Sequence, residues 1–434
     1  MEYIKTGCAE KNIEMIKGMD MTGFLARESC SAGIHDDLKI KCVVFDDGNA
    51  KFALIVCDLL GLDSQYTNEC IREVAEKLSI PTDHIVIASI HTHSGPASIL
   101  LQDCGEVDEN WLEGLKTRIV ECASMASESL NPSKLAFRTA SCDIGINRIA
   151  RDEGLKKSHV DKQVCILEIM DEGTGIVKNI LVNYACHPVT LTGTNLLYSA
   201  DYPHFMEQAL LKNERYAKSS VIFATGCCGD INPVEMGSRD ISERLGKRLA
   251  DSITDLADAQ IDEKGFSDSR LSVETLNVRI PLNTEVFETE AERLRKPAAG
   301  KDAQGKIQDE SKADRAYRHW IERIESMKRN GTFYSSVAAD IKIVRFGKLT
   351  VVTLPFEAFH EIGLKIKEYF DPDRTMVICY ANGDYGYFPS KELYDAACYE
   401  AGAAFKFYGH PGPVVRNAED ILLDAIFHHK TKPC

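Results

Sequence analysis

Residues 84–96, with the sequence HIVIASIHTHSGP, decide the fold class of this chain. The run His84–Ile90 is almost continuously apolar and rich in isoleucine and valine, which predicts a strand buried on both faces. Two histidines follow it at once, and Ser94-Gly95-Pro96 ends the strand. Reactive side chains directly after a buried strand are typical of open α/β sheets, whose binding crevices lie at the strand ends.

The same pattern recurs along most of the chain, where short apolar runs alternate with amphipathic stretches. We expect strands at Ile40–Phe45, Phe52–Asp58, His84–Ile90, Val164–Ile169, Ile180–Ala185, Ser220–Ala224, Asp340–Phe346, Thr350–Leu354 and Thr375–Ala381. We expect helices at Ser64–Ser79, Glu109–Leu130, Tyr202–Lys212 and Ser242–Leu256. The sequence therefore predicts an α/β fold with one or more mixed sheets flanked by helices.

Residues 284–330 differ in composition from the rest of the chain. They are rich in Glu, Lys, Arg and Ala and poor in β-branched residues, which predicts a pair of exposed helices broken near Pro297–Gly300. This segment is either a solvated helical insertion or a lid or subunit contact, since long insertions often carry function. No linker divides the chain, so residues 1–434 are expected to form a single domain that contains the insertion.

Charge and cysteine content limit the partners and the compartment. The 434 residues include 51 Lys and Arg against 66 Asp and Glu, a net charge of −15, which repels nucleic acid and anionic membrane surfaces. Residues 1–15 carry charges where a signal peptide needs an apolar segment. The 15 cysteines form no CxxC pair, as in reduced cytoplasmic proteins. We expect a cytoplasmic protein with a small-molecule substrate, and the 44% hydrophobic content is compatible with a homo-oligomer.

Histidines stand at the ends of two predicted strands. His91 and His93 are two residues apart, so in an extended chain they project to the same side. They can approach one metal ion or substrate, or they can belong to a hydrogen-bonded loop. His187 follows another strand, and Pro188 restrains it to an extended conformation.

Three further strand ends carry polar groups. After Ser220–Ala224, two glycines bracket Cys227-Cys228, and Asp230 then either caps the next segment or orients a metal-bound histidine. Glu357 is expected near the first turn of a helix, and Tyr387 follows the last strand. Histidines, a glutamate and tyrosines at strand ends together predict a mononuclear zinc site with water completing the coordination.

These residues resemble the N-terminal catalytic domain of the neutral/alkaline (non-lysosomal) ceramidase family. The matching stretches occur in the family's order and span nearly the whole chain: Met21–Phe24, Gly33–Asp36, His91–Pro96, Gly145–Arg148, Ala185–Pro188, Gly229–Pro233, Leu354–Phe359 and Asn382–Gly402. The resemblance implies a mixed α/β catalytic domain that binds one Zn²⁺ per chain.

The resemblance also implies roles for single residues. It gives His91, His187, Glu357 and Tyr387 as the zinc ligands. His93 is implied to be a proton donor, a proton acceptor or a hydrogen-bonding partner beside the metal. Arg148 and Tyr399 match family residues that contact the substrate or stabilise the oxyanion.

The chain departs from the family in two ways. Asn232 stands where the family carries a serine in its GDxSP motif. Asparagine is no acyl-accepting nucleophile, but its amide can donate to an oxyanion. The second departure is that about thirty residues follow the tyrosine-rich segment, so we expect no immunoglobulin-like C-terminal domain.

We therefore predict a zinc-dependent hydrolase in which metal-activated water attacks the carbonyl of a small soluble N-acyl substrate rather than membrane ceramide. In this mechanism His93 shuttles a proton and Asp230 orients a ligand. An ester or lactone hydrolase and a metal-dependent lyase or epimerase are alternatives. From another class, the chain could be an inactive, metal-stabilised binding protein.

Overall fold

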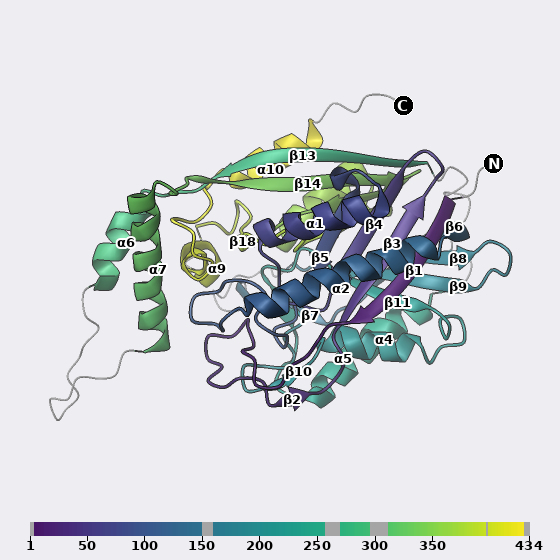
Figure 1. Ribbon diagram of the computed structural model, residues 1–434, viewed down its shortest axis with the longest axis horizontal. Coiled ribbons are helices and arrows are strands. Elements are labelled where there is room, and N and C mark those ends of the chain that lie inside the picture. Colours follow the sequence, from purple (N-terminus) through teal and green to yellow (C-terminus); the bar gives the residue numbers. More distant parts are fainter. Residues whose placement is uncertain (1–3, 150–158, 257–269, 296–310, 396–397, 429–434) are drawn as a thin grey trace.

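The computed structural model describes residues 4–149, 159–256, 270–295, 311–395 and 398–428 (Figure 1). An eight-stranded mixed sheet dominates the fold, with the strand order β11-β9-β8-β6-β1-β3-β4-β5. Its strands are β1 (Ile4–Asn12), β3 (Lys39–Asp46), β4 (Lys51–Cys57), β5 (Ile85–Ser89), β6 (Asn131–Ser141), β8 (Gln163–Asp171), β9 (Val177–Tyr184) and β11 (Ser220–Thr225). The middle of the sheet is antiparallel, whereas β4–β5 and β9–β11 pair in parallel at its two edges.

The two edges of this sheet approach each other. At the end of β11, the Thr225 hydroxyl donates to the Ile90 carbonyl just after β5 at 2.5 Å. The segment Cys379–Asn382 lies between the two edges: Cys379 N donates to Thr225 O at 2.9 Å, and Ser89 N donates to Tyr380 O at 3.1 Å. As a result, residues that follow β5, β9 and β11 meet in one region although the sheet order separates them.

A second, four-stranded sheet has the order β13-β14-β15-β17. It consists of β13 (Leu271–Pro281), β14 (Ser336–Phe346), β15 (Leu349–Thr353) and β17 (Thr375–Ile378). Asn183 of β9 joins it to the large sheet, because its amide donates to Ala224 O at 2.8 Å and to Val377 O at 3.0 Å. Short strand pairs complete the fold: β2 (Gly33–Ile34) with β10 (Leu197–Tyr198), β7 (Gly145–Asn147) with β12 (Ile231–Pro233), and β16 (Glu357–Ala358) with β18 (Tyr387–Phe388).

Helices flank both sheets. α2 (Glu109–Glu128) packs on β1 and β3, and α1 (Ser64–Leu78) packs beside it and on β5 (Figure 1). α4 (Tyr202–Leu210) and α5 (Arg239–Thr254) form a pair, while α8 (His360–Phe370) packs on β17 and α10 (Ala418–Phe427) on β13. The predicted α/β class with mixed sheets and flanking helices is confirmed. No helix among the described residues is long and apolar enough to cross a bilayer.

The charged segment forms two helices, α6 (Val286–Arg295) and α7 (Lys312–Asn330), which project at one end of the molecule (Figure 1). The expected break near Pro297–Gly300 lies outside the described residues. Phe287, Trp320 and Ile324 form a small core with Phe405, which follows the short helix α9 (Tyr399–Gly402). Helices α6 and α7 therefore pack against the segment that follows α9, next to the tyrosine-rich stretch noted in the sequence.

One local expectation is wrong. Glu357 does not lie in the first turn of a helix but in β16, where it pairs in register with Tyr387 of β18. The helix begins three residues later at His360, because residues 357–358 are held in a strand by a partner thirty residues away.

Candidate metal centre

His91, His187 and Glu357 converge on one point where the two sheet edges meet. His91 Nε2 lies 3.0 Å from Glu357 Oε2, and His187 Nε2 lies 3.1 Å from the same oxygen. All three side chains are buried, with at most 1% of their surface exposed. His91 follows β5 and His187 follows β9, whereas Glu357 lies in β16, so the topology brings together residues up to 266 positions apart.

The backbone fixes which histidine nitrogens face this point. His91 Nδ1 lies 2.8 Å from Leu60 O, and His187 Nδ1 lies 3.1 Å from Ile231 O. A ring nitrogen beside a carbonyl oxygen carries the proton, so in neutral imidazoles both Nε2 lone pairs face Glu357. Two lone pairs directed at a carboxylate oxygen repel unless a cation or a proton lies among them. The donor set therefore fits a metal ion, because Zn²⁺ binds imidazole nitrogen and carboxylate oxygen.

His91 has a strained backbone. Its φ angle is +68°, in the left-handed region that residues other than glycine rarely adopt. His91 N donates to Leu59 O at 2.8 Å, which holds this conformation. Its ring also stacks on Tyr380 with a centroid separation of 4.0 Å. Strain of this kind gathers at functional sites, and here it directs the imidazole toward Glu357.

His93 lies at the edge of the same cluster. Its Nε2 is 3.2 Å from His91 Nε2, and the ligand atoms of His91, His93 and His187 all lie within 4.8 Å of one another. Phe24 packs against the His93 ring at a centroid distance of 4.9 Å, and Arg27 donates to the His93 carbonyl at 2.8 Å. His93 can thus serve as a third nitrogen ligand or as a proton-transfer group beside the other three residues.

Arg148 links several groups on the side of the site that carries Tyr387. Its guanidinium donates to Asn232 Oδ1 at 3.2 Å, to Gly229 O at 2.7 Å and to the Tyr387 hydroxyl at 3.0 Å. Its Nε also lies 2.8 Å from Glu400 Oε1. Burial opposes the charge, but Tyr387 and Glu400 outweigh it and raise the pKa of Arg148. The result is a fixed cation beside the metal-ligand candidates.

Two expected site residues lie on this side of the cluster. The Tyr387 phenol contacts Arg148, and its backbone pairs with Glu357. Tyr399 packs edge-on to the Tyr387 ring at 6.1 Å and is 48% exposed. A partly exposed phenol is suited to meet a ligand that arrives from solvent.

Asp230 serves a different group from the one that we expected. Its carboxylate accepts from Asn147 Nδ2 at 2.7 Å and from His360 N at 2.8 Å, and it lies 2.6 Å from His360 Nδ1. The carbonyls of Leu60 and Ile231, rather than this carboxylate, contact the two converging histidines. Asp230 therefore fixes the start of α8 behind the site.

Tyr408 was missed by the sequence analysis. Its hydroxyl hydrogen-bonds to Glu357 Oε1, the oxygen that does not face the histidines. Burial raises the pKa of Tyr408 well above its ordinary value, so the phenol stays protonated and donates. The tyrosine-rich segment was expected to end at Gly402, and no local pattern separates Tyr408 from a structural tyrosine.

The ionisation of the cluster suits a metal. Burial lowers the pKa of His187 to about 4, and burial together with the two neighbouring histidines holds the pKa of His93 well below its ordinary value. Burial also disfavours the charged forms of Glu357 and His91, but the attraction between the two charged side chains outweighs the effect of burial. The pKa of Glu357 is therefore lowered and that of His91 raised. Without a metal, one proton on His91 neutralises the carboxylate, and a cation would replace it.

Residues 7–277 match the model of the neutral/alkaline non-lysosomal ceramidase N-terminal domain, which is more than half of the chain. The chain belongs to this family. The predicted resemblance is thereby confirmed. A neutral ceramidase of Oryza sativa subsp. japonica is 24% identical over 208 residues, which cover 42% of this chain and 25% of that protein. The match thus spans about a quarter of the relative's length.

Solved ceramidase structures share the fold. Neutral ceramidase from Pseudomonas aeruginosa superposes with a TM-score of 0.73 at 16% identity, covering 98% of this chain and 74% of that one. A ceramidase complexed with C2 gives the same TM-score at 15% identity. The ceramidase family match contains His91, His93, Arg148, His187, Asp230 and Asn232. Glu357, Tyr387, Tyr399 and Tyr408 lie beyond it, and the fold brings them to the same site.

Proposed function

We propose that this chain is a zinc-dependent hydrolase that cleaves the amide bond of a small N-acyl substrate. The observation that carries the proposal is the approach of two imidazole nitrogens to one carboxylate oxygen at 3.0 and 3.1 Å. His91, His187 and Glu357 would hold one zinc ion, with Tyr387 as the fourth ligand. Membership of the ceramidase family supports amide hydrolysis as the reaction.

The protein groups around the centre have separable tasks. When bound, zinc lowers the pKa of water toward about 7 and polarises a carbonyl oxygen. Arg148 is a fixed cation at the same centre and can stabilise negative charge that develops on the substrate oxygen. Tyr399 is half exposed and can donate to that oxygen from the solvent side.

His93 and Asn232 complete the proposed mechanism. A neutral His93 can accept a proton from water and deliver it to the leaving amine, since its low pKa leaves the ring unprotonated at pH 7. Asn232 Oδ1 accepts from Arg148, so its amide NH₂ group is directed elsewhere and can donate to substrate. Asparagine forms no acyl intermediate, so water is the nucleophile.

The substrate is proposed to be small and soluble, because a net charge of −15 repels anionic membrane surfaces. Asn232 favours one alternative from another class, a metal-stabilised binding protein without turnover. The cytoplasmic location, the absence of nucleic-acid and membrane partners, homo-oligomer formation and a lid role for residues 284–330 stay predictions from the sequence.

The test is an assay of N-acyl amino acids, N-acylated sugars, N-acyl alkylamines and chromogenic esters with metal-free and zinc-loaded protein. We expect zinc-dependent release of acid and amine, with one oxygen of the acid taken from ¹⁸O-labelled water. Deuterium exchange without cleavage would instead indicate an epimerase. Tight ligand binding with no product from any substrate would contradict hydrolysis and favour the binding protein.

A further inference from the structure

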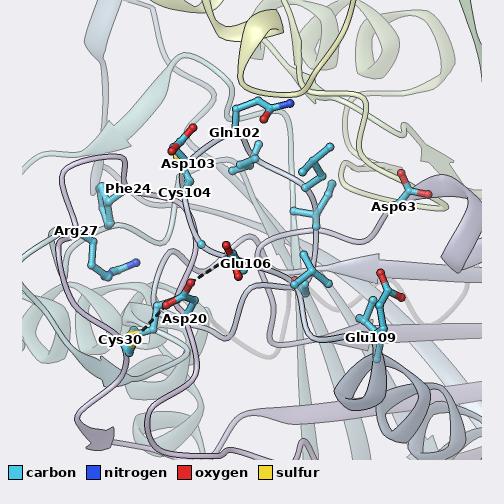
Figure 2. Close-up of a pocket in the computed structure, with 18 of the residues that line it drawn as sticks. Asp20, Phe24, Arg27, Cys30, Asp63, Gln102, Asp103, Cys104, Glu106 and Glu109 are labelled. Atoms are coloured by element: carbon cyan, nitrogen blue, oxygen red, sulfur yellow. Dashed lines mark hydrogen bonds between the residues drawn. The ribbon is translucent and has the colours of Figure 1, made fainter. Parts of the chain in front are cut away.

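A large groove lies beside the proposed centre. It has a volume of about 1080 Å³ and is bounded by the starts of α1, α2 and α7 and by residues 98–107 (Figure 2). Phe24 and Arg27 line the groove, and both also contact His93. The groove therefore adjoins the proposed metal centre across two side chains, although none of the metal-ligand candidates lines it.

The groove wall combines apolar and acidic surface. Met21, Phe24, Ile99, Leu101 and Leu112 supply apolar contacts for an alkyl chain. Eight carboxylates line the groove against three permanently charged cations and one histidine. Surface of this composition attracts a ligand that is both apolar and positively charged.

The cations are already engaged. Arg315 Nε lies 2.6 Å from Asp103 Oδ1, and His319 Nδ1 lies 2.8 Å from the other oxygen of the same carboxylate. Lys312 donates to Arg27 O at 2.6 Å, and Arg27 itself donates to three backbone carbonyls. These contacts hold the positive groups on one wall of the groove.

Most of the carboxylates have no such partner. In the part of the chain that the structure describes, six lining carboxylates form no ion pair: Asp20, Glu28, Asp63, Glu69, Glu106 and Glu109. Asp20 is held in place because it accepts from Cys30 Sγ at 3.0 Å and from Glu106 N at 2.9 Å (Figure 2). The acidic wall is thus partly ordered before a ligand arrives.

Gln102 gives an independent indication of a ligand. It lines the groove (Figure 2), and only 8% of its surface is exposed. Its backbone N donates to Phe407 O at 2.8 Å, but its side-chain amide has no hydrogen-bond partner among the described residues. Its amide atoms are not among the fully buried side-chain atoms that lack a hydrogen-bond partner, so they open to the groove and can bond to a ligand there.

We propose that this groove binds an alkyl chain that ends in a cationic amine, and that it selects substrates whose amine half carries such a chain. The proposal rests on the proposed function for the identity of the bound molecule as a substrate. Hydrolysis of N-acetyl-1,6-diaminohexane would then consume water and give acetate and 1,6-diaminohexane. The apolar wall contacts the six carbons, the carboxylates face the ammonium group, and Gln102 offers a hydrogen bond along the chain.

Three acetamides that differ only at the far end of the chain test the proposal: N-acetyl-1,6-diaminohexane, N-hexylacetamide and 6-acetamidohexanoate. Calorimetry on metal-free protein measures binding without turnover. We expect the cationic compound to bind at least tenfold more tightly than the neutral one, and the anionic compound to bind most weakly. Higher salt should weaken only the cationic compound's advantage.

Matched variants locate the effect. Glu28→Gln/Glu106→Gln removes two exposed groove carboxylates, and it should lower the affinity for the cationic compound about fivefold to tenfold. Glu214→Gln/Glu243→Gln makes the same change in net charge on the exposed surface near α4 and on α5, and it should have no effect.

Equal binding of the three compounds, preference for the anion, or identical effects of the two double variants would each overturn the inference. Selective binding of the cationic compound without its hydrolysis would support the proposed ligand of the groove and contradict only the proposed hydrolase function.

Discussion

Replacing Tyr408 with phenylalanine tests whether the Glu357 carboxylate is part of a metal site. The Tyr408 hydroxyl bonds to one oxygen of Glu357 while the other oxygen faces His91 and His187. A hydrogen bond to a charged group contributes about 1.5–3 kcal/mol, and loss of a group that orients a metal ligand typically costs about 10- to 100-fold in affinity. We expect the zinc dissociation constant of Tyr408→Phe to rise by a factor in this range.

The measurement is a competition titration with a zinc chelator, followed by an assay at limiting and at saturating zinc. Activity should fall at limiting zinc and recover largely at saturating zinc. Tyr394→Phe is the matched control, because its hydroxyl donates to Val414 O at 2.7 Å away from the site. Equally tight zinc binding by Tyr408→Phe and the control would show that the Tyr408 hydroxyl does not orient Glu357 as a metal ligand.

Three further predictions concern charge, pH and stability. Arg148→Met should lower kcat about 10²- to 10³-fold while zinc content stays the same, as measured by metal analysis beside steady-state kinetics. Zinc affinity should rise as pH increases through the raised pKa of His91, because zinc must displace the proton that Glu357 holds there, and calorimetry in buffers of different ionisation enthalpy counts this proton. Glu168→Ala should reduce the free energy of unfolding in urea by about 3–5 kcal/mol, because it strands the buried Arg138 charge. Unchanged kcat, pH-independent zinc binding or an unfolding midpoint equal to the wild type would contradict these predictions in turn.

The strands with continuous apolar sequences were predictable, and others were not. β4, β5, β9 and β11 are buried along nearly their whole length, so their hydrophobicity marks them. β1, β6 and β13 are partly exposed and include many polar residues, so no continuous apolar run marks them as strands. Strand identity here depends on pairing partners that are distant in the sequence.

The candidate site shows the same division. His91, His187 and Glu357 could be predicted as site residues because they follow buried strands, and the ends of such strands lie together at one edge of a sheet. The contacts of Asp230 with His360, 130 residues away, and of Tyr408 with Glu357 depend on the fold as a whole. No local spacing distinguishes such partners from ordinary capping or packing residues.

The most direct test of the metal centre is the zinc content of purified protein after dialysis against buffer with a weak chelator. The proposed metal centre predicts one zinc per chain in the wild type and close to none in His91→Ala and His187→Ala, with circular dichroism confirming that each variant is folded. Full zinc occupancy in either folded variant would contradict it.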